Sequence, residues 1–361
     1  MQPSAEFSGA RPPLQLIEEG QRLMAICNAC RYCEGFCAVF PAMERRLAFN
    51  EADIHYLANL CHNCAECYYA CQYAPPHEFA VNVPKVFAEI RALSYAKYAW
   101  PGFLSVSAWW AVVVGIAIGA LLGGTRVATG VDFYGVISHT AMVGVFGALA
   151  VLIVALQIAG FLRFWRDSGE TLTAFCRPSI LLKGARDALS LKNLDSNGVG
   201  CTYPDHHSSQ ARRRLHHFTF YGFMLCMAST TVAAAYHSLF GWEAPYGYFS
   251  VPVVLGTIGG VGLLVGPAGL YFLKRRRDTA IVDVKQDRSD VSFLALLFLT
   301  SVTGLLLLAW RETSAMGVLL RLHLGVVLGL FLTLPYGKYV HGIYRLAALV
   351  RSALESSRSQ H

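Results

Sequence analysis

Apolar residues in this chain are gathered into long uncharged runs. Each run is near or above the roughly 20 residues that a helix needs to cross about 30 Å of hydrocarbon. Six runs in the last two thirds of a chain leave no amphipathic helices to cover them in a soluble core. The pattern therefore predicts six transmembrane helices. The runs cover Trp100–Leu122, Phe133–Leu162, Phe218–Phe240, Tyr248–Leu273, Val291–Trp310 and Met316–Pro335, the last interrupted by Arg321 and His323.

The first 98 residues have a different pattern, with charges spread throughout and eight of the eleven cysteines. Within them, Asn50 is a predicted N-cap with Asp53 three residues later, and apolar residues follow at helical spacing. We therefore expect an all-α protein. An all-helical, two-cluster ferredoxin-like domain at residues 1–98 would precede a six-helix membrane bundle at 99–340 and a cytoplasmic tail at 341–361.

Composition and charge agree with a membrane protein. Only 15% of the 361 residues are charged, against about 25% in a soluble domain. All but three of the 30 Lys and Arg residues fall in the head, the tail and two loops, 163–214 and 274–290. Because positive charge stays in the cytoplasm, we expect an inner-membrane protein with both termini cytoplasmic. The three exceptions, placed outside, are Arg126, Arg311 and Arg321.

The net charge of +7 calls for no nucleic-acid partner. The basic stretches "RRRLHH" and "KRRR" lie at ends of predicted helices. We expect them to set topology and to contact anionic lipid. The first residues contain no apolar segment of the kind found in a secretory signal peptide.

Two cysteine motifs carry the clearest chemistry. "CNACRYCEGFC" (27–37) and "CHNCAECYYAC" (61–71) both follow C-x2-C-x2-C-x3-C. In this iron–sulfur spacing the first three cysteines bind one cluster and the fourth binds the other. The prediction is two [4Fe–4S] clusters. One would be bound by Cys27, Cys30, Cys33 and Cys71, and the other by Cys61, Cys64, Cys67 and Cys37.

Other roles for these cysteines are disfavoured. Disulfides are rare on the reducing cytoplasmic side. Structural zinc sites usually have two cysteine pairs separated by a dozen or more residues. The remaining cysteines fit no ligand pattern and are interpreted as structural: Cys176, Cys201 and Cys226.

Histidines in the apolar helices are candidate ligands of b-type haem, because ionisable residues inside a bilayer are usually functional. His237 and His323 form the predicted outer pair, with Arg321 near a haem propionate and His139 as an alternative outer ligand. His216 or His217 would pair with His341 on the inner side. His323 and His341 are expected on one helix, about five turns apart, although Pro335 lies between them. The alternative is hydrogen-bonded histidines at helix ends.

Four stretches resemble a known family: "ACRYCEGFCAVFPAMERR", "CHNCAECYYACQYAPPHEFAVNVP", "GCTYPDHHSSQARRRLHH" and "YGKYVHGIYRLAALVR". The chain resembles the tricarballylate-utilisation membrane iron–sulfur proteins (TcuB, also called CitB). The resemblance implies that a soluble flavoprotein oxidises tricarballylate to cis-aconitate, and that this protein reoxidises its FADH2 for the respiratory chain. Related proteins fused to a flavoprotein in cobalamin synthesis are described as carrying haem, and the haem-bearing membrane subunits of nitrate reductases are distantly similar. This chain has no flavoprotein half.

The expected function is electron transfer from a soluble FAD-dependent dehydrogenase, through the clusters and haem, to membrane quinone, without an organic-substrate site of its own. Tyr336 and Lys338 are candidate quinone contacts, with interfacial anchoring as the alternative. Two other functions compete. One is a redox-sensing or transport protein, and the other is the membrane anchor of a different anaerobic-type reductase.

Overall fold

The computed structural model describes residues 12–101, 108–122, 132–195 and 200–358, and these are mostly helical. The strands found there are two short ones that pair antiparallel, β1 (Cys201–Thr202) and β2 (Ser208–Ser209). The predominance of helix confirms the expected class. The head contains α1 (Pro13–Cys30), α2 (Val39–Glu44), α3 (Glu51–Leu60), α4 (Glu66–Tyr69) and α5 (Val83–Tyr98).

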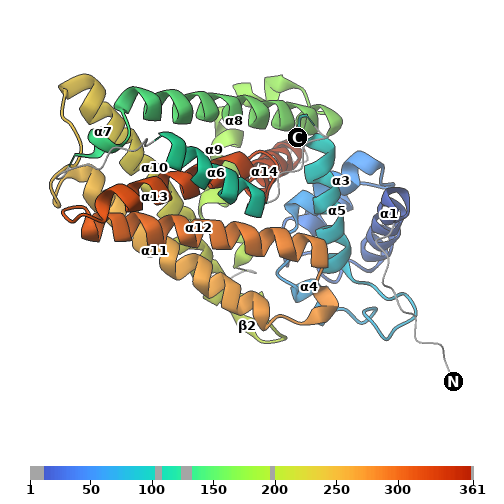
Figure 1. The fold of residues 1–361 in the computed structure, drawn as a ribbon. Helices are drawn as coiled ribbons and strands as arrows, with labels where there is room; N and C mark the ends of the chain where they lie inside the picture. Colours follow the sequence, from blue (N-terminus) through green and yellow to red (C-terminus); the bar gives the residue numbers. More distant parts are fainter. Residues whose placement is uncertain (1–11, 102–107, 123–131, 196–199, 359–361) are drawn as a thin grey trace.

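The remaining helices form the rest of the molecule (Figure 1). They are α6 (Ala108–Leu122), α7 (Phe133–Val136), α8 (His139–Asp167), η1 (Leu172–Cys176), α9 (Pro178–Leu189), η2 (Lys192–Leu194), α10 (Ala211–Phe240), α11 (Val251–Arg275), η4 (Thr279–Ile281), α12 (Val284–Trp310), α13 (Met316–Thr333) and α14 (Val340–Arg358).

Five of these helices, α8 and α10 to α13, are long and apolar enough to cross a membrane, which indicates a membrane protein. The other predicted span contains α6, which is apolar but shorter in the described part of the chain. The segments on either side of it, 102–107 and 123–131, lie outside the described residues, as does Arg126. A sixth crossing therefore stays a prediction.

Close backbone packing joins the long helices in pairs. A Cβ added to Gly222 of α10 would lie 2.9 Å from the Gly259 carbonyl oxygen of α11, and one added to Gly119 of α6 would lie 2.8 Å from the Arg321 carbonyl oxygen of α13. Small residues permit this approach in membrane helices. The glycine-rich stretches of α11 are therefore packing surfaces, as their place in an apolar helix predicts.

The expectation that His323 and His341 share one helix is wrong. Helix α13 ends at Thr333, and α14 begins at Val340. Pro335 lacks the N–H that would continue the helical ladder. The two histidines therefore belong to separate helices, and their spacing along the sequence does not fix their relative position.

Helix α14 runs back onto the head, at the end of the long helices where α1, α3 and α5 lie (Figure 1). Tyr344 and Ala347 of α14 belong to the same buried apolar core as Leu57 of α3 and Phe87 of α5. Residues that we expected to form a tail therefore pack against the head as part of its core. In α3 itself, Asn50 and Asp53 form the reciprocal capping box that the sequence predicts.

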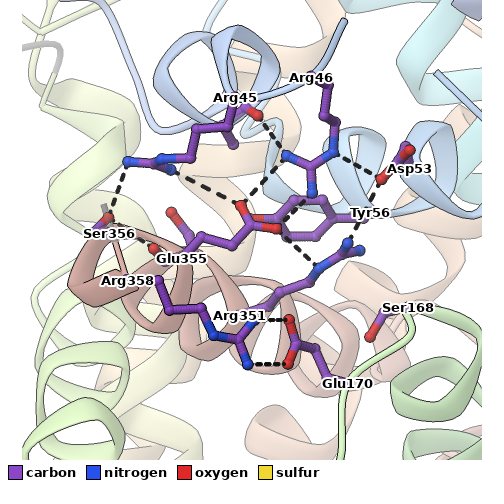
Figure 2. A network of polar contacts seen from close by, with 12 residues as sticks. Arg45, Arg46, Asp53, Tyr56, Ser168, Glu170, Arg351, Glu355, Ser356 and Arg358 are labelled. Carbon is purple, nitrogen blue, oxygen red and sulfur yellow. Dashed lines mark hydrogen bonds and ion pairs between the residues drawn. The ribbon is translucent and has the colours of Figure 1, made fainter. Parts of the chain in front are cut away.

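A buried polar network fastens α14 to the head (Figure 2). Arg46 contacts Asp53 at 2.7 Å and Glu355 of α14 at 2.5 Å. Arg351 contacts Glu355 at 3.1 Å, and its guanidinium lies 4.1 Å from the centre of the Tyr56 ring. These groups are mostly shielded from water and reciprocally paired, so removing one member would leave others with unbalanced charge.

Some residues of the basic stretches at the helix ends make internal contacts, while Arg214, Arg275 and Arg276 are exposed. In "RRRLHH", Arg213 pairs with Asp195 at 3.0 Å, and Arg212 donates to the Asn63 carbonyl of the head. In "KRRR", Lys274 and Arg277 both pair with Asp287, at 3.0 and 2.8 Å. Carboxylates and carbonyls of this chain therefore bind part of each stretch, and contact of the exposed arginines with anionic lipid stays a prediction.

Candidate functional site

Each cysteine motif contains residues with a left-handed backbone conformation, at which the chain turns sharply. Arg31, which follows Cys30, has φ of 55°, and Asn63 and Ala65 have φ of 55° and 67°. L-residues adopt this conformation uncommonly. These turns interrupt α1 and the end of α3, and so direct cysteines that are three positions apart toward a shared space.

The cysteines form two sets of four around two neighbouring cavities. One cavity, of about 280 Å³, is lined by Cys27, Cys30, Cys33 and Cys71, with Cys67 also at its wall. We call these four the exposed set, because Cys30 is exposed to solvent. The other cavity is lined by Cys37, Cys61, Cys64 and Cys67, which we call the buried set. This grouping is the crossed arrangement that the motif spacing predicts, although metal ligation itself stays a prediction.

The thiols of each set influence one another's ionisation. The pKa of Cys27 is raised to about 12, because burial disfavours its thiolate and the other three members of its set oppose added negative charge. In the buried set, burial and the thiols of Cys64 and Cys61 raise the pKa of Cys67. The thiols of Cys27 and Cys67 therefore stay protonated at neutral pH, and metal binding would release their protons.

Among the described residues, no group of three or more His, Cys, Asp or Glu side chains is arranged to bind a single metal ion. A polynuclear cluster needs its four sulfur ligands further apart than one tetrahedral ion does, because each thiolate binds a different iron atom. The cavity of the exposed set, at about 280 Å³, has room for such a cluster, whereas the cavity of the buried set is only about 10 Å³ and would have to widen to hold one.

Cys201 lies beside the buried set, although we interpreted it from sequence as structural. Its thiol is fully buried, contacts the Leu194 carbonyl oxygen at 3.3 Å, and hydrogen-bonds with Cys64 and Arg212. No spacing rule could reveal this contact, because 137 positions separate Cys64 from Cys201. Sequence reasoning also missed Arg91 and Arg345, which donate to the Cys61 carbonyl.

The structure brings His216 and His341 together on the side of the bundle next to the head. Their ring centres are 6.2 Å apart. Two imidazoles on opposite sides of one iron have ring centres about 6 Å apart, since each metal–nitrogen bond is about 2 Å long. His341 Nδ1 contacts the Lys338 carbonyl, which leaves Nε2 available. His216 Nδ1 is buried and has no hydrogen-bond partner in the described chain. The rings meet edge to face, at 73°, and a haem held by this pair stays a prediction.

His217 points elsewhere, with its ring centre 5.6 Å from that of Tyr221. Adjacent helical residues are rotated by about 100° from each other, so only one of the two histidines can face His341. The geometry favours His216 over His217 as the inner candidate.

The outer histidines are arranged differently. His139 and His237 stack with ring centres 3.5 Å apart, which leaves no room for iron between the rings. His323 Nδ1 contacts Thr303 Oγ1 at 3.0 Å. Among the described residues, the rings of His237 and His323 do not contact each other. Arg321 is two positions before His323 on α13, and such residues do not share a helix face. An outer haem stays a prediction.

The candidate quinone contacts make other interactions in this structure. The Tyr336 hydroxyl donates to the Trp100 carbonyl at 3.2 Å, and Lys338 pairs with Asp290 at 2.7 Å. Burial lowers the pKa of Lys338 to about 8, partly opposed by Asp290. Both residues lie between α13 and α14, close to the head.

Fold and site together define a helical membrane protein with a cysteine-rich head. Residues 20–97 match the family described as "Citrate utilization protein B Fer4-like domain", and residues 102–361 match "Citrate utilization protein B". A relative from Escherichia coli called "Citrate utilization protein B" is 51% identical over 357 residues, which cover 95% of this chain and 93% of the relative. The chain belongs to the citrate utilization protein B family, and this confirms the resemblance seen in its sequence. No solved structure matches it.

Membership in this family and the Fer4-like domain indicate iron–sulfur binding and a role in electron transfer. The four cysteines of each motif lie within the residues matched by the Fer4-like domain. The second match covers every candidate histidine.

Proposed function

We propose that this protein is an inner-membrane electron carrier that reoxidises a soluble FAD-dependent dehydrogenase and reduces membrane quinone. When bound, two [4Fe–4S] clusters and b-type haem supply the one-electron carriers that link a two-electron flavin to quinone. Cys27, Cys30, Cys33 and Cys71 would bind one cluster, and Cys37, Cys61, Cys64 and Cys67 the other. His216 and His341 are the first candidates for haem.

One observation carries this proposal: the buried thiol set and the His216–His341 pair are joined by the same two helices. Arg212 of α10 and Arg345 of α14 both donate to backbone carbonyls of the second cysteine motif. Each arginine is four positions from one of the histidines, so each pair shares a helix face. The head is therefore positioned directly against the inner end of the candidate haem site.

The orientation of the protein follows from the same contacts. The core shared by the head and α14 places both ends of the described chain on one side of the long helices. Together with the bias of Lys and Arg toward the head, the tail and two loops, this supports cytoplasmic termini. A soluble dehydrogenase in the cytoplasm would then reach the exposed thiol set.

The test measures electron flow in membranes that contain the full-length protein and its co-purifying dehydrogenase. Cys64→Ser should lower quinone reduction by the dehydrogenase at least tenfold and reduce bound iron. The control is Cys226→Ser, which changes a cysteine of α10 outside both thiol sets. Unchanged electron flow with a full iron content in Cys64→Ser would disprove the proposal.

The identity of the co-purifying protein separates the alternatives. A flavoprotein dehydrogenase that delivers electrons to quinone supports the proposal. A terminal reductase that draws electrons from quinol indicates the anchor of another anaerobic-type reductase, and solute flux through reconstituted protein without haem indicates transport.

A further inference from the structure

Three arginines from three different helices converge on the backbone of the second cysteine motif. Arg91 of α5 donates to the carbonyls of Ala58 and Cys61, at 3.2 and 3.1 Å. Arg345 of α14 donates to Asn59 and Cys61, at 3.3 and 2.7 Å. Arg212 of α10 donates to Asn63 and His62, at 2.6 and 3.0 Å. We call Arg91, Arg212 and Arg345 the arginine triad.

The triad carries positive charge that the described protein does not neutralise. Across the described residues, none of the three guanidiniums has a carboxylate within 4.0 Å. Arg91 is buried, with 3% of its surface exposed. The pKa of Arg345 is lowered to about 10, because burial and then the charge of Arg91 disfavour its protonated form. Buried positive charge without an anion is costly.

Capping of α3 explains only part of this charge. The last carbonyls of a helix attract basic side chains, and the negative end of a helix dipole amounts to about half an elementary charge. The three positive charges of the guanidiniums are several times larger than this half charge at the helix end. The excess lies next to Cys61 and Cys64, which are ligand candidates of the buried set.

The surroundings of the exposed set differ from those of the buried set. Burial, the thiols of Cys71 and Cys30, and the carboxylate of Glu66 together raise the pKa of Cys33 to about 12. Glu66 also acts on Cys201 beside the buried set, but Arg212 opposes it there. Glu66 therefore acts on both sets, whereas three guanidiniums lie against the backbone of the second cysteine motif and concentrate positive charge beside the buried set.

This asymmetry affects reduction directly. Bound iron–sulfur clusters become more negative when they accept an electron, and nearby charge, hydrogen bonds and solvent exposure set their potentials. Burial alone would make the buried set the weaker electron acceptor, because a low-dielectric site disfavours added charge. Fixed positive charge acts in the opposite direction and favours reduction.

We propose that the arginine triad makes a cluster bound by the buried thiol set the electron-accepting end of the head. A cluster held by the exposed set would take one electron from the partner's reduced flavin. A cluster held by the buried set, beside His216 and His341, would then accept that electron as the first cluster is reoxidised. This inference rests on the proposed function, and it assigns the three arginines as positioning residues that act through charge.

The test is a redox titration of the intact, anaerobically purified protein, with each cluster followed by its electron paramagnetic resonance signal. Arg345→Gln should weaken reduction of one cluster at least tenfold, a shift of about 59 mV to lower potential for a one-electron couple. The other cluster should shift much less. Arg345→Lys, which retains the charge, should restore most of the potential. Arg31→Gln, beside the exposed Cys30, is the matched control and should leave the buried cluster unchanged.

Arg212→Gln provides a second variant, in case loss of Arg345 prevents folding, and should shift the same cluster. The inference is overturned if both variants keep two clusters at their original potentials, or if both clusters shift equally. It is also overturned if Arg345→Lys and Arg345→Gln behave alike. Iron and acid-labile sulfide in the unaltered protein report separately on the proposed function: without two clusters that proposal fails, whereas two clusters insensitive to the triad contradict only the inference.

Discussion

The two sides of the head differ in what surrounds their cysteines. On the side of the exposed set, Cys30 and Tyr32 are open to solvent, and Tyr32 keeps 68% of its surface exposed. On the side of the buried set, Cys61 and Cys64 are each only 7% exposed and are covered by the arginine triad and the chain around Cys201. One side is open to solvent, and the other is covered by residues of α5, α10 and α14.

This difference suggests a division of labour for an electron carrier. An entry site must be reachable from solution, because a protein partner has to approach it closely. An exit site benefits from a fixed contact that excludes water between the head and the membrane helices and keeps the site near the next carrier. The Arg46–Glu355 network and the apolar core that the head shares with α14 provide that contact.

Loss of a ligand on the open side should have the largest effect. Cys30→Ser is expected to remove the cluster of the exposed set and to leave the sealed one, so that bound iron and sulfide fall by roughly half. Metal and sulfide analysis of the purified protein checks this. Complete loss of iron, or no loss, would contradict two independently assembled sets.

Breaking the polar network between Arg46 and Glu355 should have a smaller effect, on the free energy of unfolding. Glu355→Gln removes the carboxylate that Arg46 and Arg351 share, and we expect a loss of about 3 kcal/mol in the free energy of unfolding. Denaturant unfolding in detergent, followed through the head, measures it. A loss below about 1 kcal/mol would show that the network contributes little.

Acidification should weaken the head through His55, which contacts Ser94 of α5 at 2.8 Å. Burial lowers the pKa of this 2% exposed histidine to about 4, below its ordinary value of about 6.5. The unfolded chain therefore binds more protons between these values, so stability is complete above pH 6.5 and falls as the pH drops toward 4. The slope is at most about 1.4 kcal/mol per pH unit. His55→Gln should flatten unfolding curves measured across this range, and an unchanged slope would contradict the assignment.

The smallest effect is expected for an ion pair on the open side. Arg22 pairs with Glu19 at 2.7 Å within α1, but 43% of the Arg22 side chain is exposed. Arg22→Ala should therefore lower the free energy of unfolding by less than about 1 kcal/mol. The same denaturation assay provides the comparison with Glu355→Gln, and a similar loss in both variants would remove the distinction between the two sides.

Local patterns predicted much of this structure. Uncharged runs identified the long helices, Asn50 and Asp53 marked the start of α3, and the repeated motif anticipated two groups of four cysteines. Each of these depends on residues close together in sequence, or on a spacing repeated twice.

The parts that sequence could not reveal depend on long-range packing. Arg345 meets Cys61 from 284 positions away, and no periodicity links them. The basic stretch around Arg212 was open to a lipid interpretation, because only the folded head supplies the carbonyls that it binds. The break after Thr333 also separated His323 from His341, and only packing shows that His341 meets His216.

The most direct test of the central claim is an anaerobic absorption spectrum of the purified protein, oxidised and then reduced with dithionite, with iron and acid-labile sulfide assayed on the same sample. The account predicts sharp b-type haem bands above a broad cluster absorbance, with more iron than sulfide. Equal iron and sulfide without haem bands would contradict haem in the relay. Absence of labile sulfide would contradict the iron–sulfur relay itself.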